Sequence, residues 1–126
     1  MEQTLKNDNW LAQWKYEPGE WNRFARWLLL RRGSISHILY FLNPFRQERF
    51  AQVKISAATV YVNARARSFR SANRKLIAVE IFSVGKLNIL EIYYKSGKEA
   101  AVISVPVPKG KLKEAIILEK KLTTVG

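Results

Sequence analysis

The sequence predicts a mostly-β α+β domain: an antiparallel sheet or partly open barrel of five to seven strands, capped by a C-terminal helix and flanked by an N-terminal helix. Three observations predict this class. Apolar runs separated by turn residues fill residues 76–107. Short runs rich in Val and Ile fill residues 51–63, and residues 111–122 have the spacing of an amphipathic helix.

The strongest strand signal is a β-meander over residues 76–107. Its runs are Leu76–Phe82, Leu87–Tyr94 and Ala100–Val107. The segments between them, Ser83–Lys86 and Ser96–Lys98, have the composition of hairpin turns. The three strands are therefore expected to pair antiparallel.

Alternation within the second and third runs predicts one buried face. Glu80 and Glu91 stand on neighbouring strands, and both are interpreted as solvent-face residues paired with Lys or Arg. The residues expected inside are Leu90, Ile92, Tyr94, Ile103, Val105 and Val107; those that alternate with them are Asn88, Glu91, Tyr93, Val102, Ser104 and Pro106.

Two other segments supply the remaining strands. Residues 51–63 are predicted to form a hairpin around Ser56–Thr59, with Lys54 and Tyr61 facing outward, and residues 11–16 to form a short strand. The inward residues of the hairpin are Val53, Ile55, Val60 and Val62.

A helix is predicted at each end of the sheet. The first begins at Glu17–Glu20, where Pro18 suits a first turn and the acids complement the helix dipole, and it runs to about Arg32. The apolar face of the first helix holds Trp21, Phe24 and Leu28; that of the second, at 111–122, holds Leu112, Ala115, Ile116 and Leu122.

The whole chain, residues 1–126, fits one domain. It divides into a polar tail (1–9), a helix and apolar block (18–45), the sheet (51–107) and the last helix (111–122). It has no cysteine, and its polar start lacks the basic and apolar parts of a signal peptide. We therefore expect a cytoplasmic protein, peripheral at the inner face of a membrane.

The formal charge of +12 is concentrated in the middle of the chain, where residues 45–79 hold eight Lys and Arg and one acid. Residues 65–75 carry five cations and no acid. They are interpreted either as a solvated loop between strands or as a polyanion-binding segment. The candidate binding residues are Arg65, Arg67, Arg70, Arg74 and Lys75, and Phe69 among them offers stacking to a nucleic acid.

Residues 27–45 form the most apolar part of the chain, but they are too short and too interrupted to span a membrane. One interpretation is a helix or bend packed over one end of the sheet. The other is an amphipathic element that contacts a membrane or a partner. In that second case the contacting residues are Trp27, Leu28, Arg31, Arg32, Tyr40, Phe41, Arg46 and Arg49.

The sequence is poor in catalytic chemistry. His37 is the only histidine and Asp8 the only aspartate, so a catalytic triad or a multi-histidine metal site cannot be assembled from one chain. There is no glycine-rich phosphate loop. We predict no enzyme activity, no catalytic residue, no metal and no cofactor.

Several short motifs resemble those of a known group. They are Leu11-Ala12-x-Trp14, Glu20-Trp21-x-x-Phe24, the Val-x-Ile/Val-x-Val hairpin, and Val105-Pro106-Val107-Pro108-x-Gly110 before a last helix. Together they resemble uncharacterised bacterial membrane-associated proteins with a pleckstrin-homology-like domain. The resemblance implies a sheet closed by a C-terminal helix. Such proteins carry a pair of membrane-spanning helices where this chain has only its interrupted apolar block.

The functional expectation is a non-enzymatic binding or scaffold module at the cytoplasmic face of a membrane or membrane protein complex. The basic residues would meet anionic headgroups and the apolar block would add a second contact. The alternative is a nucleic-acid-binding protein that uses residues 65–75. The sequence gives no prediction of the oligomeric state.

Overall fold

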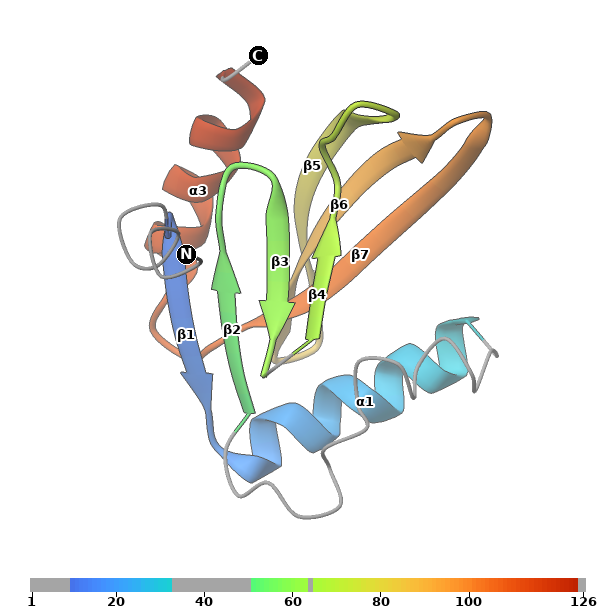
Figure 1. The fold of residues 1–126 in the computed structure, drawn as a ribbon. Coiled ribbons are helices and arrows are strands. Elements are labelled where there is room, and N and C mark those ends of the chain that lie inside the picture. Colours follow the sequence, from blue (N-terminus) through green and yellow to red (C-terminus); the bar gives the residue numbers. More distant parts are fainter. Residues whose placement is uncertain (1–9, 33–50, 64, 125–126) are drawn as a thin grey trace.

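The computed structural model describes residues 10–32, 51–63 and 65–124. Its strands form two antiparallel sheets, ordered β1-β2-β3-β4 and β5-β6-β7, which are not closed into a barrel (Figure 1). A helix precedes the second strand and another ends the chain, so the predicted mostly-β α+β class is confirmed. The elements are β1 (Ala12–Tyr16), α1 (Pro18–Arg32), β2 (Ala51–Ile55), β3 (Thr59–Val62), β4 (Arg65–Ser68), β5 (Arg74–Val84), β6 (Leu87–Ser96), β7 (Glu99–Val107) and α3 (Leu112–Thr124).

The first sheet contains the strand predicted at residues 11–16, the hairpin predicted at residues 51–63, and one further strand that was not predicted. β1 pairs with β2, and β2 with β3 around the Ser56 turn, where the Ser56 hydroxyl accepts hydrogen bonds from the N–H groups of Ala58 and Thr59. The extra strand is β4, which pairs with β3. Residues 65–68 are therefore not a loop between strands, because their backbone is paired along the edge of the sheet.

The second sheet is the predicted meander, with β6 between β5 and β7. Counting back from the β5–β6 turn, each β5 residue pairs regularly with β6 as far as Ala78 opposite Tyr93. Ile77 is then an extra residue, and Leu76 lies opposite Tyr94. This β-bulge moves every earlier residue of β5 to the opposite face of the sheet.

The two sheets pack over one hydrophobic core, which also takes side chains from both helices. The first sheet contributes the four inward residues predicted for the hairpin, all of which are buried, and Ala12, Trp14 and Tyr16 from β1. The second sheet departs from the prediction, because β6 is buried on both faces: Ile89 and Glu91 on one and Leu90 and Ile92 on the other.

Glu91 is therefore not a solvent-face residue, and that part of the prediction is wrong. Its carboxylate accepts a hydrogen bond from the Ser104 hydroxyl at 2.7 Å and another from the Tyr93 hydroxyl. A buried carboxylate is tolerable when hydroxyl groups satisfy its oxygens. Glu80 lies directly opposite Glu91 in the sheet and is exposed, as predicted.

Helix α1 begins as the sequence predicts. The Glu20 carboxylate accepts a hydrogen bond from the Glu17 N–H at 3.1 Å, and its other oxygen accepts one from the Lys109 N–H at 2.8 Å. One carboxylate thus caps α1 and ties it to the turn before α3. The predicted face of Trp21, Phe24 and Leu28 is buried.

Helix α3 packs against β1 and β5, and so covers one side of the stacked sheets (Figure 1). Trp14 Nε1 donates a hydrogen bond to Glu114, which ties the helix to β1. The predicted inward face was partly wrong, because Leu112 and Ile116 are 40% and 41% exposed. The buried residues of the helix are Ala115, Leu118 and Leu122.

Tyr16 joins the end of β1 to the edge of the second sheet. Its side chain is buried, and its hydroxyl donates a hydrogen bond to the carbonyl of Pro106 at 2.6 Å. Burial raises the pKa of the Tyr16 hydroxyl well above 10, and the negative charge of Glu20 raises it further. The phenol is therefore a neutral donor throughout the physiological range.

Candidate anion-binding site

At the edge of the first sheet, β4 lies across from the start of β5, the end of β6 and the start of β7. A groove of about 800 Å³ lies there. The cross-strand register explains its basic character: Arg65 and Arg67 lie opposite Val62 and Val60, so the side chains of β4 that share the core-facing side are arginines. The groove is lined by Ala66, Arg67, Ser68, Arg74, Tyr94, Ser96, Glu99, Ala100 and Ala101.

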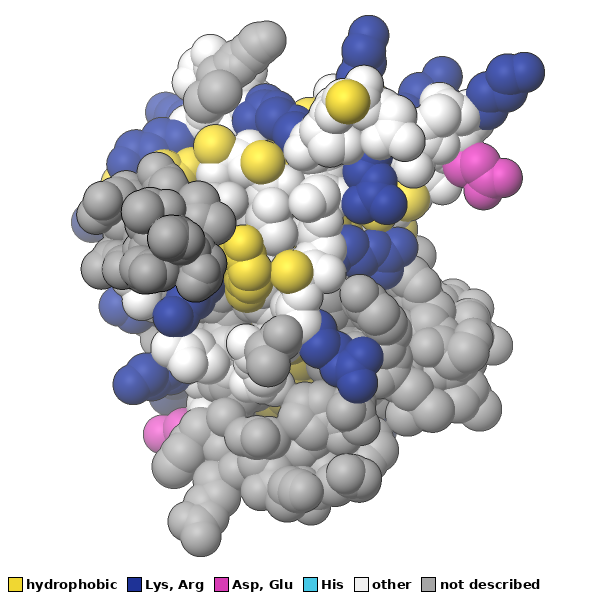
Figure 2. Space-filling view, in the orientation of Figure 1, with side chains coloured by type: hydrophobic (Ala, Val, Ile, Leu, Met, Phe, Trp, Pro, Cys, Tyr) yellow, Lys and Arg dark blue, Asp and Glu magenta, His cyan; other side chains and the backbone are white. Residues whose placement is uncertain are grey.

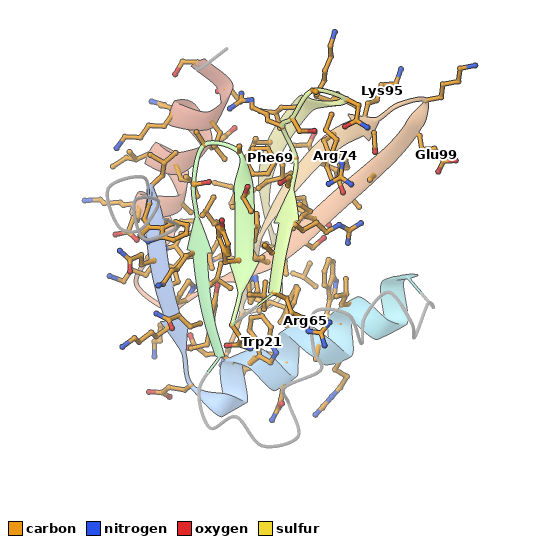
Figure 3. All side chains as sticks on the ribbon, in the orientation of Figure 1. Trp21, Arg65, Phe69, Arg74, Lys95 and Glu99 are labelled. Carbon is orange, nitrogen blue, oxygen red and sulfur yellow. The ribbon has the colours of Figure 1, made fainter. Side chains whose placement is uncertain are left out.

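Two arginines meet at one tyrosine in this groove. Arg67 Nε donates a hydrogen bond to the Tyr94 hydroxyl at 3.1 Å. The Arg74 guanidinium lies over the Tyr94 ring, 5.9 Å from its centroid, and its Nη1 donates to the Ser68 carbonyl at 3.0 Å. Figure 3 shows Arg74 between β4 and the second sheet. Both guanidinium groups are held by the fold and are only half-buried.

A second hollow, of about 510 Å³, lies on the other side of Arg74. Thr123 in the last turn of α3 and the bulge residue Ile77 belong to its wall. Because Arg74 lines both hollows, the basic surface runs from the groove to the C-terminal end of α3. The lining of the second hollow is Arg70, Ser71, Arg74, Lys75, Leu76, Ile77 and Thr123.

The five cations predicted to bind a polyanion have different environments. Arg67 and Arg74 lie in the groove, and Arg65 is half-buried at the start of β4. Lys75 is exposed on the outer face of the second sheet, directly opposite exposed Lys95. Two like charges at a cross-strand pair repel one another, so an anion at this face would relieve an existing repulsion.

Arg70 has a structural role that its sequence position did not indicate. Its Nη1 donates to the Ala57 carbonyl and its Nη2 to the Leu122 carbonyl, both at 2.8 Å. The first carbonyl belongs to the β2–β3 turn and the second to the last turn of α3. Arg70 therefore ties the two elements together and caps the negative end of the helix.

Of the residues predicted to contact a membrane or partner, two have described side chains. Leu28 is buried, and Trp27 is half-buried with its ring 5.9 Å from that of Phe82 and 6.1 Å from that of Phe24. Both thus pack on the core. Arg31 and Arg32 end α1, but their side chains are not described. Tyr40, Phe41, Arg46 and Arg49 lie outside the described residues, as does His37.

Sequence reasoning missed Tyr94, Ser96 and Glu99 as members of the site. Tyr94 was assigned to the core on alternation, and it is indeed buried, yet its ring and hydroxyl also form the floor between two arginines. The predicted strand began at Leu76, so nothing in the sequence indicated that Arg74 continues this strand and lies beside Tyr94.

This arrangement is suited to holding an anion. Guanidinium groups recognise phosphate and carboxylate through paired N–H groups, and partial burial strengthens such bonds relative to open water. Within the described residues, Nη1 is the only guanidinium nitrogen of Arg74 that donates a hydrogen bond to a protein acceptor, so the N–H groups of Nε and Nη2 are available. The carboxylate of Glu99, which is exposed and lines the groove, repels an anion, so an anion in the groove would lie closer to the arginines than to Glu99.

Two searches of the described residues gave no site of another kind. No cluster of three or more His, Cys, Asp or Glu in that part of the chain could hold a metal ion. None of the described helices has the length and apolar character needed to cross a bilayer.

Comparison with known proteins adds no assignment. No family model matches the chain, and neither the curated proteins nor the solved structures include a match. The resemblance to pleckstrin-homology-like proteins therefore stays a prediction.

Proposed function

We propose that this protein is a non-enzymatic binding module that docks on an anionic membrane surface, through the groove that contains Arg67 and Arg74. Lys75 and Lys95 extend the positive surface outside the groove. Figure 2 shows Lys and Arg side chains spread over the end of the molecule where α3 ends and where β6 turns into β7. A field of this sign concentrates anionic lipid headgroups near the surface.

The observation that carries the proposal is the convergence of two arginines on Tyr94 in an open groove. Arginines at the core-facing positions of an edge strand reduce the apolar surface that the core can bury there. In return they provide guanidinium groups in a fixed orientation, which lowers the entropy lost when an anion binds.

Binding to vesicles tests the proposal. The wild-type protein should co-sediment with vesicles that contain phosphatidylserine and should not co-sediment with phosphatidylcholine alone. Each cation near an anionic surface contributes about 1 kcal/mol, so Arg67→Gln with Arg74→Gln should weaken binding about 30-fold. Wild-type binding should also fall steeply between low and high salt.

A matched control separates the groove from net charge. Lys86 is exposed at the β5–β6 turn, at the other end of these strands. Lys86→Gln should leave vesicle affinity within about twofold, since a distant exposed charge is largely screened. Equal losses per removed charge in the groove and control variants would mean that only total charge matters, and equal binding to both vesicle types would contradict the proposal.

The alternative function is nucleic-acid binding by the same basic residues. Phe69, which was expected to stack on a base, is fully buried, and this removes the aromatic that favoured the alternative. A filter-binding titration with single- and double-stranded oligonucleotides provides the comparison. Strong binding there with a steep salt slope, together with no binding to anionic vesicles, would favour nucleic acid over lipid.

A further inference from the structure

The outer face of α3 exposes three large aliphatic side chains. Leu112, Ile116 and Ile117 are 40%, 41% and 53% exposed, and they are three of the five large hydrophobic residues identified as exposed in the described chain. The inward face of α3 is already satisfied by Ala115, Leu118 and Leu122. Single exposed aliphatics are ordinary, and three on one short helix together form an apolar patch.

The spacing of these residues defines one continuous surface. At about 100° per residue, Leu112, Ile116 and Ile117 span an arc of about 140° on the side away from the core. The exposed lysines Lys113 and Lys120 lie within that same arc. The helix acids flank it, and Glu114 is engaged by Trp14. The outward arc is therefore apolar and positive, with no acid inside it.

This arc adjoins the basic surface described above. Thr123, near the end of α3, lines the second hollow together with Arg74, Lys75 and Ile77. Ile77 is 55% exposed because the bulge turns it out of the regular pairing. The C-terminal end of the arc thus adjoins the second hollow, whereas Leu112, at the start of α3, lies about 16 Å farther along the helix axis.

We propose that the outward arc of α3, through Leu112, Ile116 and Ile117, inserts into the interfacial region of an anionic bilayer. This inference rests on the proposed function and names the element that supplies its apolar contact. The residue types in the arc favour a lipid bilayer over a protein partner. The centres of protein interfaces are depleted in Lys and enriched in aromatic residues and Arg, whereas this arc has lysines between aliphatics and no aromatic.

Lysine between aliphatic residues suits a bilayer for a physical reason. The lysine stem can lie along the acyl region while the ammonium group reaches the anionic headgroups. A protein partner would have to desolvate those same ammonium groups and pair each one. The charge of the arc is therefore complementary to an anionic lipid surface.

The first test is a pair of serine substitutions in the full chain. Ile116→Ser with Ile117→Ser should weaken binding to phosphatidylserine vesicles about tenfold or more, because each side chain has about half of its surface left to bury. The loss should be similar at low and high salt, unlike that of the Arg67→Gln, Arg74→Gln variant. Val84→Ser, at an exposed valine beside the β5–β6 turn, is the matched control and should bind like wild type.

A second test reports insertion directly. The chain has no cysteine, so Ile117→Cys carries a single environment-sensitive fluorophore. Anionic vesicles should shift its emission to the blue, while a label at Val84→Cys should show no shift. Thermal unfolding of the serine variants should match wild type, since the substituted residues lie outside the core.

The outcomes separate the two proposals. If wild type does not bind anionic vesicles, the proposed function and this inference both fail. If wild type binds and the Ile116→Ser, Ile117→Ser variant binds equally, or the label at residue 117 does not respond, only the inference fails. A concentration-dependent dimer that this variant abolishes would instead assign the arc to a second copy of the chain.

Discussion

Arg70→Ala should destabilise the fold although Arg70 lies in the most basic part of the sequence. The substitution removes both bonds to the carbonyls of Ala57 and Leu122. It also removes one of the positive charges at the C-terminal end of α3, where Lys121 remains. The β2–β3 turn and the helix would then be joined only through the core.

The expected magnitude follows from those contacts. Hydrogen bonds from a charged donor contribute about 1.5–3 kcal/mol each, and partial exposure of Arg70 reduces that figure. We expect the free energy of unfolding to fall by about 2–4 kcal/mol, including the contribution of the helix dipole. For a domain of this length, the unfolding temperature should fall by on the order of 10 °C.

Circular dichroism during heating and urea titration measures both quantities. Lys75→Ala is the control, because it removes an exposed cation five residues away and should change stability by less than about 0.5 kcal/mol. Arg70→Lys should lie between wild type and Arg70→Ala, since one ammonium group cannot reach two separate carbonyls as a guanidinium does. If Arg70→Ala melts within about 1 °C of wild type, the bonds to the turn and helix contribute nothing and the reasoning is wrong.

Two further predictions concern buried groups. Because the pKa of Tyr16 is raised in the folded state, the folded protein keeps a proton that the unfolded protein loses above pH 10.0. The contribution of Tyr16 to the free energy of unfolding is therefore fully present below pH 10.0. Above that pH it falls by up to about 1.4 kcal/mol per pH unit. Tyr16→Phe should be less stable by about 0.5–1.5 kcal/mol at pH 7 and should lack this additional fall in urea titrations from pH 9 to 11. Glu91→Ala should lower the free energy of unfolding by about 2–4 kcal/mol, because two hydroxyl groups lose their hydrogen-bond acceptor. Glu80→Ala, at the exposed cross-strand partner of Glu91, should have little effect. Equal urea midpoints for the Glu91 and Glu80 variants would contradict this account.

Most of the fold could be predicted from periodicity and turn chemistry. The meander, the hairpin at 51–63, the strand at 11–16 and both helices are present because their apolar spacing and their turn residues agree. The strand β4 was missed because arginines occupy the positions that face inward, and an alternation rule recognises only apolar residues there.

The groove could not be predicted for a different reason, which is the bulge at Ile77. Regular pairing from the β5–β6 turn would place Arg74 opposite Gly97, on the outer face of the sheet. The extra residue places Arg74 opposite Ser96, on the inner face beside Tyr94. Apolar periodicity cannot detect one additional residue in a strand that is apolar on both sides of the bulge.

The face of α3 that meets the core was predicted only in part. Ala115 and Leu122 are buried as predicted, but Leu118 completes that face in place of Leu112 and Ile116. Two aliphatic faces compete on this helix, and only packing against β1 and β5 decides between them.

The bond from Tyr16 to Pro106 bears on how this protein avoids aggregation. β7 is the last strand of its sheet, and an unpaired edge of this kind can recruit a strand from another molecule. Proline has no N–H to offer to such a strand, and the Pro106 carbonyl already accepts the Tyr16 hydroxyl. An incoming chain therefore finds no donor at this point and a carbonyl that already accepts one hydrogen bond, so Pro106 and Tyr16 together disfavour edge-to-edge pairing through the end of β7.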